Sequence, residues 1–241
     1  RFFNLLNIPV YTKRHINAFD LNLVQKLIHI LRYLATEHYI PFSGDEILFK
    51  ILHYDWFNIE PMKIAKLSIE VSERKYKSQK TSIRELLKER STAPAGHLFP
   101  DNNDPSLKRA SDIIEQLIAE VPNNTLQMLL ERIIMETGVV NTILQKHDKY
   151  WQLQVLTAFF DFIKEETHRN PTMHLSELVE LIYLMEKEKL SLPIVQTSGT
   201  EKGVNLMTAH GSKGLEFEHV FVAGINAKLW EKKQAFNRNY K

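Results

Sequence analysis

Residues 208–217 bring together side chains that could bind phosphates, a nucleotide or a strand of nucleic acid. The segment reads Thr-Ala-His-Gly-Ser-Lys-Gly-Leu-Glu-Phe. It follows an apolar–polar alternation that predicts a buried strand over residues 204–208, and an apolar run at 220–223 predicts a second strand. In open α/β sheets, ligands bind beyond the carboxyl ends of the strands, so we expect an exposed turn at a sheet edge. An ordinary strand-to-helix turn would have the same spacing.

The chemistry of this turn is that of contacts to phosphates and sugars. Thr208 and His210 stand two positions apart at the end of a predicted strand, where alternate side chains point the same way. A hydroxyl and an imidazole suit hydrogen bonds to the phosphate oxygens of a single strand, which position nucleic acid without reading its sequence. Lys213 can add a charge-assisted contact. Gly214 permits a close backbone approach, and Glu216 offers an acceptor to a ribose hydroxyl.

A Walker-type phosphate loop does not fit the same segment. That loop requires Gly-Lys followed by Ser or Thr, with another Gly earlier at a fixed spacing. Here Ser212 precedes Lys213, Gly214 follows it, and the earlier Gly is missing.

The same ten residues resemble the fifth conserved motif of UvrD/Rep-like superfamily 1 DNA helicases, which is written T-x-H-x-x-K-G-L-E-F. All seven specified positions match, and Gly211 stands where Ser or Ala is commoner. The resemblance implies that Thr208 and His210 contact the backbone of single-stranded DNA. It also implies that Glu216 binds the sugar of the nucleotide in the cleft between two RecA-like domains. Closing that cleft on ATP would then move a segment that also grips the strand.

The start of the chain carries a weaker likeness to the same family. Residues 1–12 are predicted to be the end of a helix followed by a strand, and the run Leu-Asn-Ile-Pro-Val-Tyr at 6–11 is similar to the junction after the fourth motif in the second RecA-like domain. The Gly-Gly turn and Arg-x-Glu-Ile run that usually follow are replaced by Lys-Arg-His-Ile-Asn. We therefore assign no ligand contact there.

Between these two ends the sequence is predicted to be helical nearly throughout. Apolar residues at helical spacing predict a helix over residues 20–36, and a capping box at 43–46 predicts the start of another. Pro61 suits the first turn of a third helix. Further helices are expected at 82–90, 106–120, 124–136, 139–147, 150–169 and 174–190, with a loop at 92–105 and a linker at 191–203.

The predicted fold class is therefore mainly α, with a multi-helix insertion subdomain flanked by short α/β pieces of a RecA-like domain. We assign residues 1–19 and 196–241 to the RecA-like domain and residues 20–195 to the insertion. This order is similar to that of UvrD-like helicases, which carry a helical insertion within their second RecA-like domain. The Gly-Ile-Gly hairpin that such insertions often use for duplex DNA has no counterpart near residues 53–61.

A basic strip within the predicted insertion is a second candidate DNA contact. Residues 73–90 carry seven basic and three acidic side chains, a local charge of +4, with Tyr76 among them. Lys and Arg contacts to phosphates dominate non-specific DNA affinity, although a solvated helix face would have the same composition. The residues that we assign to the strip as DNA contacts are Arg74, Lys75, Lys77, Lys80 and Arg84.

Composition narrows the remaining possibilities. Thirty-one basic and 29 acidic side chains leave a net charge of +2, so DNA binding would have to use a local patch. The absence of cysteine excludes disulfides and thiolate metal sites. The histidines are scattered without the pairing expected of a zinc site, so we assign no metal ligand and no catalytic residue. No apolar run approaches the ~18 residues of a membrane span, so no membrane partner is expected.

The sequence thus predicts a fragment of an ATP-dependent DNA helicase that translocates on single strands and unwinds duplex in the bacterial cytoplasm. Expected partners are single-stranded DNA, single/double-strand junctions and the remaining helicase domains of the parent chain. The parent would use ATP and Mg²⁺. The Walker A, Mg²⁺-binding and sixth motifs do not occur in these 241 residues, so we expect the fragment alone to be inactive. The alternatives are the helicase subunit of an AddA/RecB-type helicase-nuclease and a helical protein-docking module.

Overall fold

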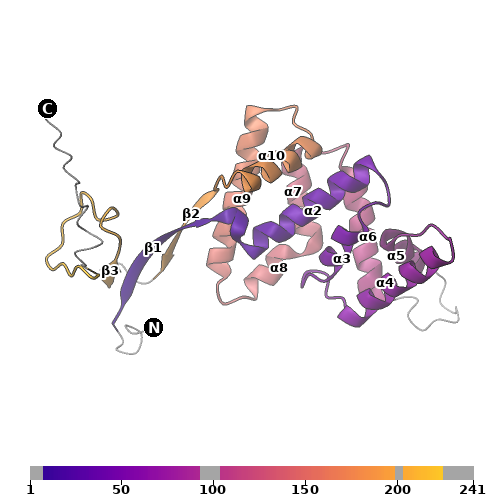
Figure 1. Cartoon of the computed structure of the whole chain (residues 1–241), viewed down its shortest axis with the longest axis horizontal. Helices are drawn as coiled ribbons and strands as arrows, with labels where there is room; N and C mark the ends of the chain where they lie inside the picture. The colour runs from indigo at the N-terminus through magenta and orange to yellow at the C-terminus, as the bar shows by residue number, and fades with distance from the viewer. Residues whose placement is uncertain (1–7, 93–103, 199–202, 225–241) are drawn as a thin grey trace, which may run out of the picture. The chain divides into compact units, whose positions relative to one another are not determined.

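The computed structural model describes residues 8–92, 104–198 and 203–224. Within these ranges the chain is mainly helical with one small sheet, which confirms the predicted fold class (Figure 1). The chain divides into two compact units. Arg14–Gln196 form the first, called here the helical unit, and the described residues 8–13 and 197–224 belong to the second, called the motif unit.

A single asparagine joins the entry and exit of the helical unit. Strand β1 (Val10–Asn17) leads through a 3-10 turn, η1 (Ala18–Asp20), into helix α2 (Asn22–Tyr39). The side-chain oxygen of Asn17 accepts hydrogen bonds from the backbone N–H groups of Phe19, at 3.2 Å, and Leu192, at 2.9 Å. The Leu192 carbonyl in turn accepts from the Ala18 N–H at 2.8 Å. These bonds satisfy backbone groups at the point where the chain changes structure.

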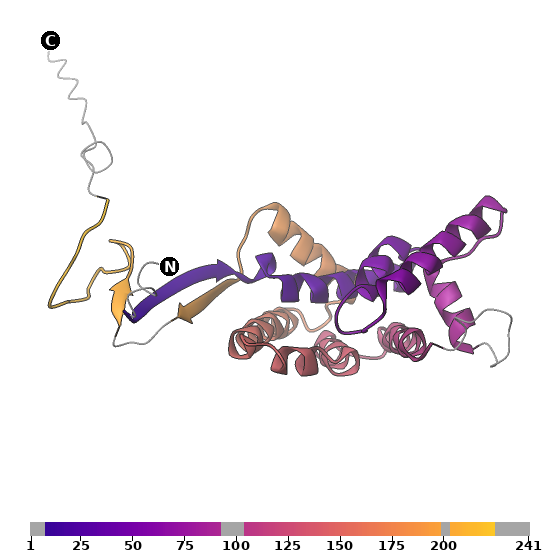
Figure 2. The same ribbon diagram turned by 90° about the horizontal axis from the view of Figure 1, so that it is seen from below.

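Helix α2 is the element around which the helical unit packs (Figures 1 and 2). It contacts α3 (Asp45–Leu52), α6 (Pro105–Glu120), α9 (Lys149–Arg169) and α10 (Leu175–Lys187). The predicted apolar positions are all buried, and α2 continues three residues beyond its predicted end. Fully burying one such aliphatic side chain contributes about 1.5–3 kcal/mol relative to leaving it exposed. The buried aliphatic residues of α2 are Leu23, Val24, Leu27, Ile28, Ile30, Leu31 and Leu34.

The remaining helices complete this packing around α2. Helix α4 (Pro61–Tyr76) packs on α5 (Ile83–Thr92), and α5 lies against α6. Helices α7 (Leu126–Thr137) and α8 (Val139–Leu144) pack on α9. Pro61 and Pro105 occupy the first turns of their helices, where a missing N–H costs nothing. Gly138 separates α7 from α8 with a φ of +75°, which favours glycine.

The small sheet differs from the predicted strands. Its order is β2-β1-β3, and the segment predicted as a linker contains β2 (Pro193–Ser198). Strand β3 (Val204–Leu206) pairs in parallel with β1, with Val10 opposite Val204. Pro193 is tolerated because it is the first residue of a strand at the edge of the described sheet. No strand forms over residues 220–223, so that prediction is wrong.

The predicted capping box at residues 43–46 is also wrong. The N-cap of α3 is Gly44, which has no side chain to accept a bond, and the Ser43 hydroxyl instead donates to the Ile40 carbonyl at 2.7 Å. The backbone N–H of Gly44 is satisfied from another helix, by a carboxylate oxygen of Glu37 at 2.8 Å.

Candidate functional site

Strand β3, which pairs with β1, leads into the predicted motif of residues 208–217. The Val204 N–H donates to the Pro9 carbonyl at 2.7 Å. A Cβ on the preceding residue, Gly203, would lie 2.5 Å from that same carbonyl oxygen, so the close strand approach requires glycine. The strand ends at Leu206, before the predicted residue 208.

The segment after β3 folds into a series of hydrogen-bonded turns. The Thr208 hydroxyl oxygen accepts from the Gly211 N–H at 3.0 Å, and the Thr208 carbonyl accepts from the Ser212 N–H at 3.1 Å. The His210 carbonyl accepts from the Lys213 N–H at 3.3 Å. Side-chain turns of this kind compete with regular structure and fix the local backbone. Because the Thr208 oxygen is an acceptor here, its own hydrogen stays available for donation to a ligand.

All five motif residues assigned to ligands are exposed: Thr208, His210, Lys213, Gly214 and Glu216. Thr208 and His210 both lie beyond the end of β3, so strand alternation does not align them as the sequence suggested. Gly214 has a φ of +81°, and no described atom lies within 4 Å of the position that its Cβ would take. The backbone there is therefore open to close approach.

Apolar side chains around the motif are exposed within the described part of the chain. Phe221, expected to be buried in a strand, is 95% exposed. Large apolar side chains on a surface commonly mark a region that another surface covers. The exposed set comprises Leu215, Phe217, Val220, Phe221 and Val222.

The basic strip of the helical unit is largely neutralised by carboxylates of the same unit. Arg74 forms ion pairs with Glu70, at 2.8 Å, and Glu89, at 2.9 Å. Lys75 pairs with Asp45 at 3.2 Å. Carboxylates that are near the strip in the folded unit thus offset part of the local charge of +4 counted along the sequence.

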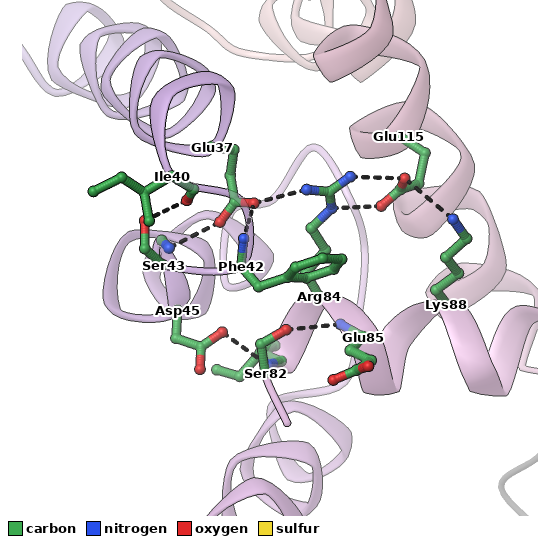
Figure 3. A network of polar contacts seen from close by, with 12 residues as sticks. Glu37, Ile40, Phe42, Ser43, Asp45, Ser82, Arg84, Glu85, Lys88 and Glu115 are labelled. Carbon is green, nitrogen blue, oxygen red and sulfur yellow. Dashed lines mark hydrogen bonds and ion pairs between the residues drawn. The ribbon is translucent and has the colours of Figure 1, made fainter. Parts of the chain in front are cut away.

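Arg84 lies in the interior of a polar network and not on the exposed strip (Figure 3). Its side chain is 11% exposed. Nη1 donates to Glu37 at 2.7 Å, while Nε and Nη2 donate to the two oxygens of Glu115 at 2.6 and 2.9 Å. The guanidinium also covers the Phe42 ring, 4.8 Å from its centroid. The Arg84 hydrogen bonds lower the pKa of Glu115, and those same bonds raise the pKa of Arg84. The assignment of Arg84 to a DNA-contacting surface is therefore corrected to a structural role.

Glu37 is a central residue of this network, and nothing in the sequence analysis singled it out. Its side chain is 1% exposed, and besides Arg84 its carboxylate accepts from the backbone N–H groups of Phe42 and Gly44, each at 2.8 Å. A Cβ on Gly44 would lie 2.7 Å from the Tyr33 ring, so glycine is required there. The sequence pattern that could have identified Glu37 is its position four residues after Tyr33, which places a carboxylate on the apolar face of α2.

Two lysines of the strip are exposed and form no ion pair with another described residue. Lys77 and Lys80 follow α4 on the connection to α5, beside Tyr76, which is 93% exposed. Neither lysine has an ion pair with another described residue. Figure 2 shows α4 and α5 projecting at one end of the helical unit. The part of the strip that is exposed and has no carboxylate partner among the described residues is thus reduced to this tip.

Two further classes of feature do not occur in the described ranges. No group of three or more His, Asp or Glu side chains is arranged there to hold a metal ion. In the same ranges, no helix combines the length and apolar character needed to cross a bilayer.

Comparison with known proteins agrees with the resemblance of residues 208–217. The sequence pattern of the UvrD-like helicase C-terminal domain matches residues 2–234. A protein named probable DNA helicase II homolog, from Mycoplasma capricolum, is 26% identical over 108 residues, which are 45% of this chain and 15% of that protein. The chain thus spans a small part of this relative. Because the family pattern extends over nearly the whole chain, the protein belongs to the family of UvrD-like helicase C-terminal domains.

Proposed function

We propose that this chain is part of an ATP-dependent DNA helicase that translocates along single-stranded DNA and unwinds duplex. Membership of the UvrD-like family supports a helicase-type function. The observation that carries the finer proposal is the exposed turn of residues 208–216, in which the Gly211 N–H holds the Thr208 oxygen at 3.0 Å and leaves the hydroxyl hydrogen to be donated.

In this proposal the first half of the turn binds the DNA backbone. The Thr208 hydroxyl, a His210 ring N–H and the Lys213 ammonium would donate to phosphate oxygens, contacts that hold a strand without reading its bases. All three side chains are exposed, and none has an ion pair with a described carboxylate. Lys77 and Lys80 at the tip of the helical unit would add weaker, salt-sensitive contacts.

The second half of the turn would hold the nucleotide. The exposed Glu216 carboxylate is an acceptor suited to a ribose hydroxyl, and the open space beside Gly214 suits close approach of a ligand to the backbone. These features fit ATP, which with Mg²⁺ would supply the phosphoryl group in the full-length parent. Thr208 and Glu216 are only eight positions apart, so movement of this segment would change the contacts to both the DNA strand and ATP.

Two matched sets of substitutions in the full-length parent test these roles. Thr208→Ala/His210→Ala should weaken single-stranded DNA binding at least about tenfold and leave the KM for ATP unchanged, because each of the two hydrogen bonds to a charged group contributes about 1.5–3 kcal/mol. Glu216→Gln should raise the KM for ATP and leave DNA affinity unchanged. His219→Ala and Glu218→Gln replace neighbouring exposed residues of the same types and serve as controls. Equal effects of motif and control substitutions would refute the proposal.

We also propose that these 241 residues alone do not hydrolyse ATP. The measurement is ATPase activity of the purified chain with and without single-stranded DNA. Activity that Glu216→Ala abolishes would contradict this part of the proposal, whereas activity that Glu216→Ala leaves intact would point to a contaminant.

A further inference from the structure

An open groove of about 1330 Å³ lies in the helical unit, at a place where two helices end and two begin. The last turns of α2 and α9 line it, together with the loop before α7, the loop before α10 and the first turns of both these helices. Four of its lining residues are basic or imidazole side chains: His38, Lys164, His168 and His174. No Asp or Glu lines it, so we call it the acid-free groove.

The basic side chains of the acid-free groove are not neutralised. In the described part of the chain, no ion pair joins Lys164 or any of the three histidines to a carboxylate. All four side chains are exposed. The neighbouring acidic residues of α9, Glu165 and Glu166, both pair with Arg169 outside the groove.

The acidic residue nearest to the start of α10 is also already engaged. The carboxylate of Glu177 accepts a hydrogen bond from the backbone N–H of His174 at 2.9 Å. It therefore caps the helix, and it is not one of the groove's lining residues.

The other polar groups of the groove are of the kinds that contact phosphate and sugar. Seven of the lining residues are Asn, Gln, Ser or Thr. Together with Lys and backbone N–H groups at helix starts, these side chains make most protein contacts to a nucleic-acid backbone. The one aromatic lining residue, Tyr39, is 81% exposed at the end of α2, so the groove offers no row of rings on which bases would stack.

We propose that the acid-free groove binds the phosphodiester backbone of a nucleic-acid strand. The Lys164 ammonium has no carboxylate partner among the described residues and attracts a polyanion, the histidine rings offer N–H donors to phosphate oxygens, and the open form admits a continuous strand where a closed pocket would admit only a small anion. The helicase family of the chain favours nucleic acid over an acidic peptide. This inference goes beyond the roles proposed for residues 208–216, because the groove lies entirely within Arg14–Gln196.

The first test measures DNA binding by the 241-residue chain with the motif disabled. In a Thr208→Ala/His210→Ala background, fluorescence anisotropy is recorded with labelled single-stranded and duplex DNA at low and near-physiological salt. Adding Lys164→Gln/His168→Gln should weaken binding about fivefold and reduce the slope of log affinity against log salt by about 1. The matched control is His147→Gln/Lys187→Gln, which changes the same residue types at exposed positions outside the groove and should change nothing.

Either form of DNA would satisfy the proposal, and the two probes show which one the groove prefers. Absence of DNA binding would overturn it, as would equal losses in the groove and control variants. Loss of binding only with Lys77→Gln/Lys80→Gln would assign the contact to the tip of α4 and α5 and would equally reject the groove.

A second measurement locates the ligand directly. The imidazole NMR signals of His168 and His174 should shift when a short oligonucleotide is added, while the His147 signal stays in place. A poly-glutamate peptide serves as the polyanion control. Shifts of the same size with this peptide would show an acidic protein segment to be an equal occupant and would contradict the proposal. Failure of the motif substitutions in the parent helicase would leave this result unaffected, so the two proposals fail separately.

Discussion

The basic strip and the acid-free groove hold most of their basic side chains in different environments. In the strip, Arg74, Lys75 and Arg84 all face carboxylates of the same unit. In the groove, Lys164 and three histidines are among the lining residues, and no carboxylate is. The strip is the more basic region along the sequence, yet three of its five assigned residues pair with carboxylates, whereas Lys164 and the histidines of the groove have no carboxylate partner among the described residues.

The difference between strip and groove shows that basic residues clustered in the sequence can serve to stabilise the fold. The Arg84 guanidinium joins α5 to Glu37 of α2 and to Glu115 of α6, and all of its strongest contacts lie within the protein. Breaking a buried pair is costly because the partner left behind is an uncompensated charge. A cationic side chain placed in this way stabilises the fold. Its N–H donors are bonded to carboxylates, so it is poorly placed to bind a phosphate.

The largest expected effect that follows from this comparison is that of Glu37→Ala. The substitution would leave Arg84 with one carboxylate partner and would remove the acceptor of the Phe42 and Gly44 N–H groups. We expect the free energy of unfolding to fall by about 3–5 kcal/mol, as for other broken buried pairs. Urea denaturation of the chain, followed by circular dichroism, measures it.

The control for that experiment is Glu85→Ala, which removes an exposed carboxylate from the first turn of α5. Its loss should be about 0.5 kcal/mol, the usual size for an exposed charge at a helix start. If both substitutions cost the same, the network in Figure 3 contributes no special stability and the contrast between strip and groove is lost.

A smaller effect should appear as a difference in acid sensitivity. Hydrogen bonds from Arg84 hold the pKa of Glu115 below its ordinary value. A depressed carboxyl pKa stabilises the fold above the pKa of the unfolded chain, about 4.3 for Glu, and this contribution is lost as the pH falls through the folded value. Glu115→Gln should therefore be less stable at neutral pH and should lose less of its remaining stability on acidification.

The groove offers the matched comparison for this pH experiment. Lys164→Gln/His168→Gln removes no carboxylate and no ion pair between described residues, so the decline of stability below about pH 4.3 should follow that of the unmodified chain. Urea midpoints recorded from neutral to acid pH for the three proteins provide the test. A Glu115→Gln curve parallel to that of the unmodified chain would show that the Arg84 bonds carry no acid-dependent stability.

Local patterns in the sequence predicted most of the helices. Apolar residues at helical spacing located α2, and Pro61 correctly marked a helix start. Strand β2 was missed because its residues, Pro-Ile-Val-Gln-Thr-Ser, alternate too briefly to distinguish a strand from a linker. Its pairing in the sheet comes from contacts distant in the sequence, which a local pattern does not contain.

The functional regions divide in the same way. The motif at residues 208–217 could be read from the sequence because its members are neighbours in the chain. The role of Arg84 could not, because its partners Glu37 and Glu115 lie 47 and 31 positions away. The acid-free groove was even harder to predict from the sequence. His38 is on α2 and Lys164 is on α9, and neither stands in a basic run. Charge counted along the chain therefore shows neither which basic residues of the strip are paired nor that the basic groups of the groove lie together.

The smallest effect is expected at the tip of the strip, where Lys77 and Lys80 are exposed. Lys77→Gln/Lys80→Gln should change the free energy of unfolding by less than about 0.5 kcal/mol, because neither ammonium pairs with another described residue. DNA affinity of the chain should fall about two- to threefold at low salt and be unchanged near physiological salt, since such contacts are screened there. Anisotropy at both salts, with Lys187→Gln as control, provides the measurement. A loss larger than that of Lys164→Gln/His168→Gln would make the tip the principal DNA contact of the helical unit, and the paired arginines of the strip would then serve to hold that tip in position.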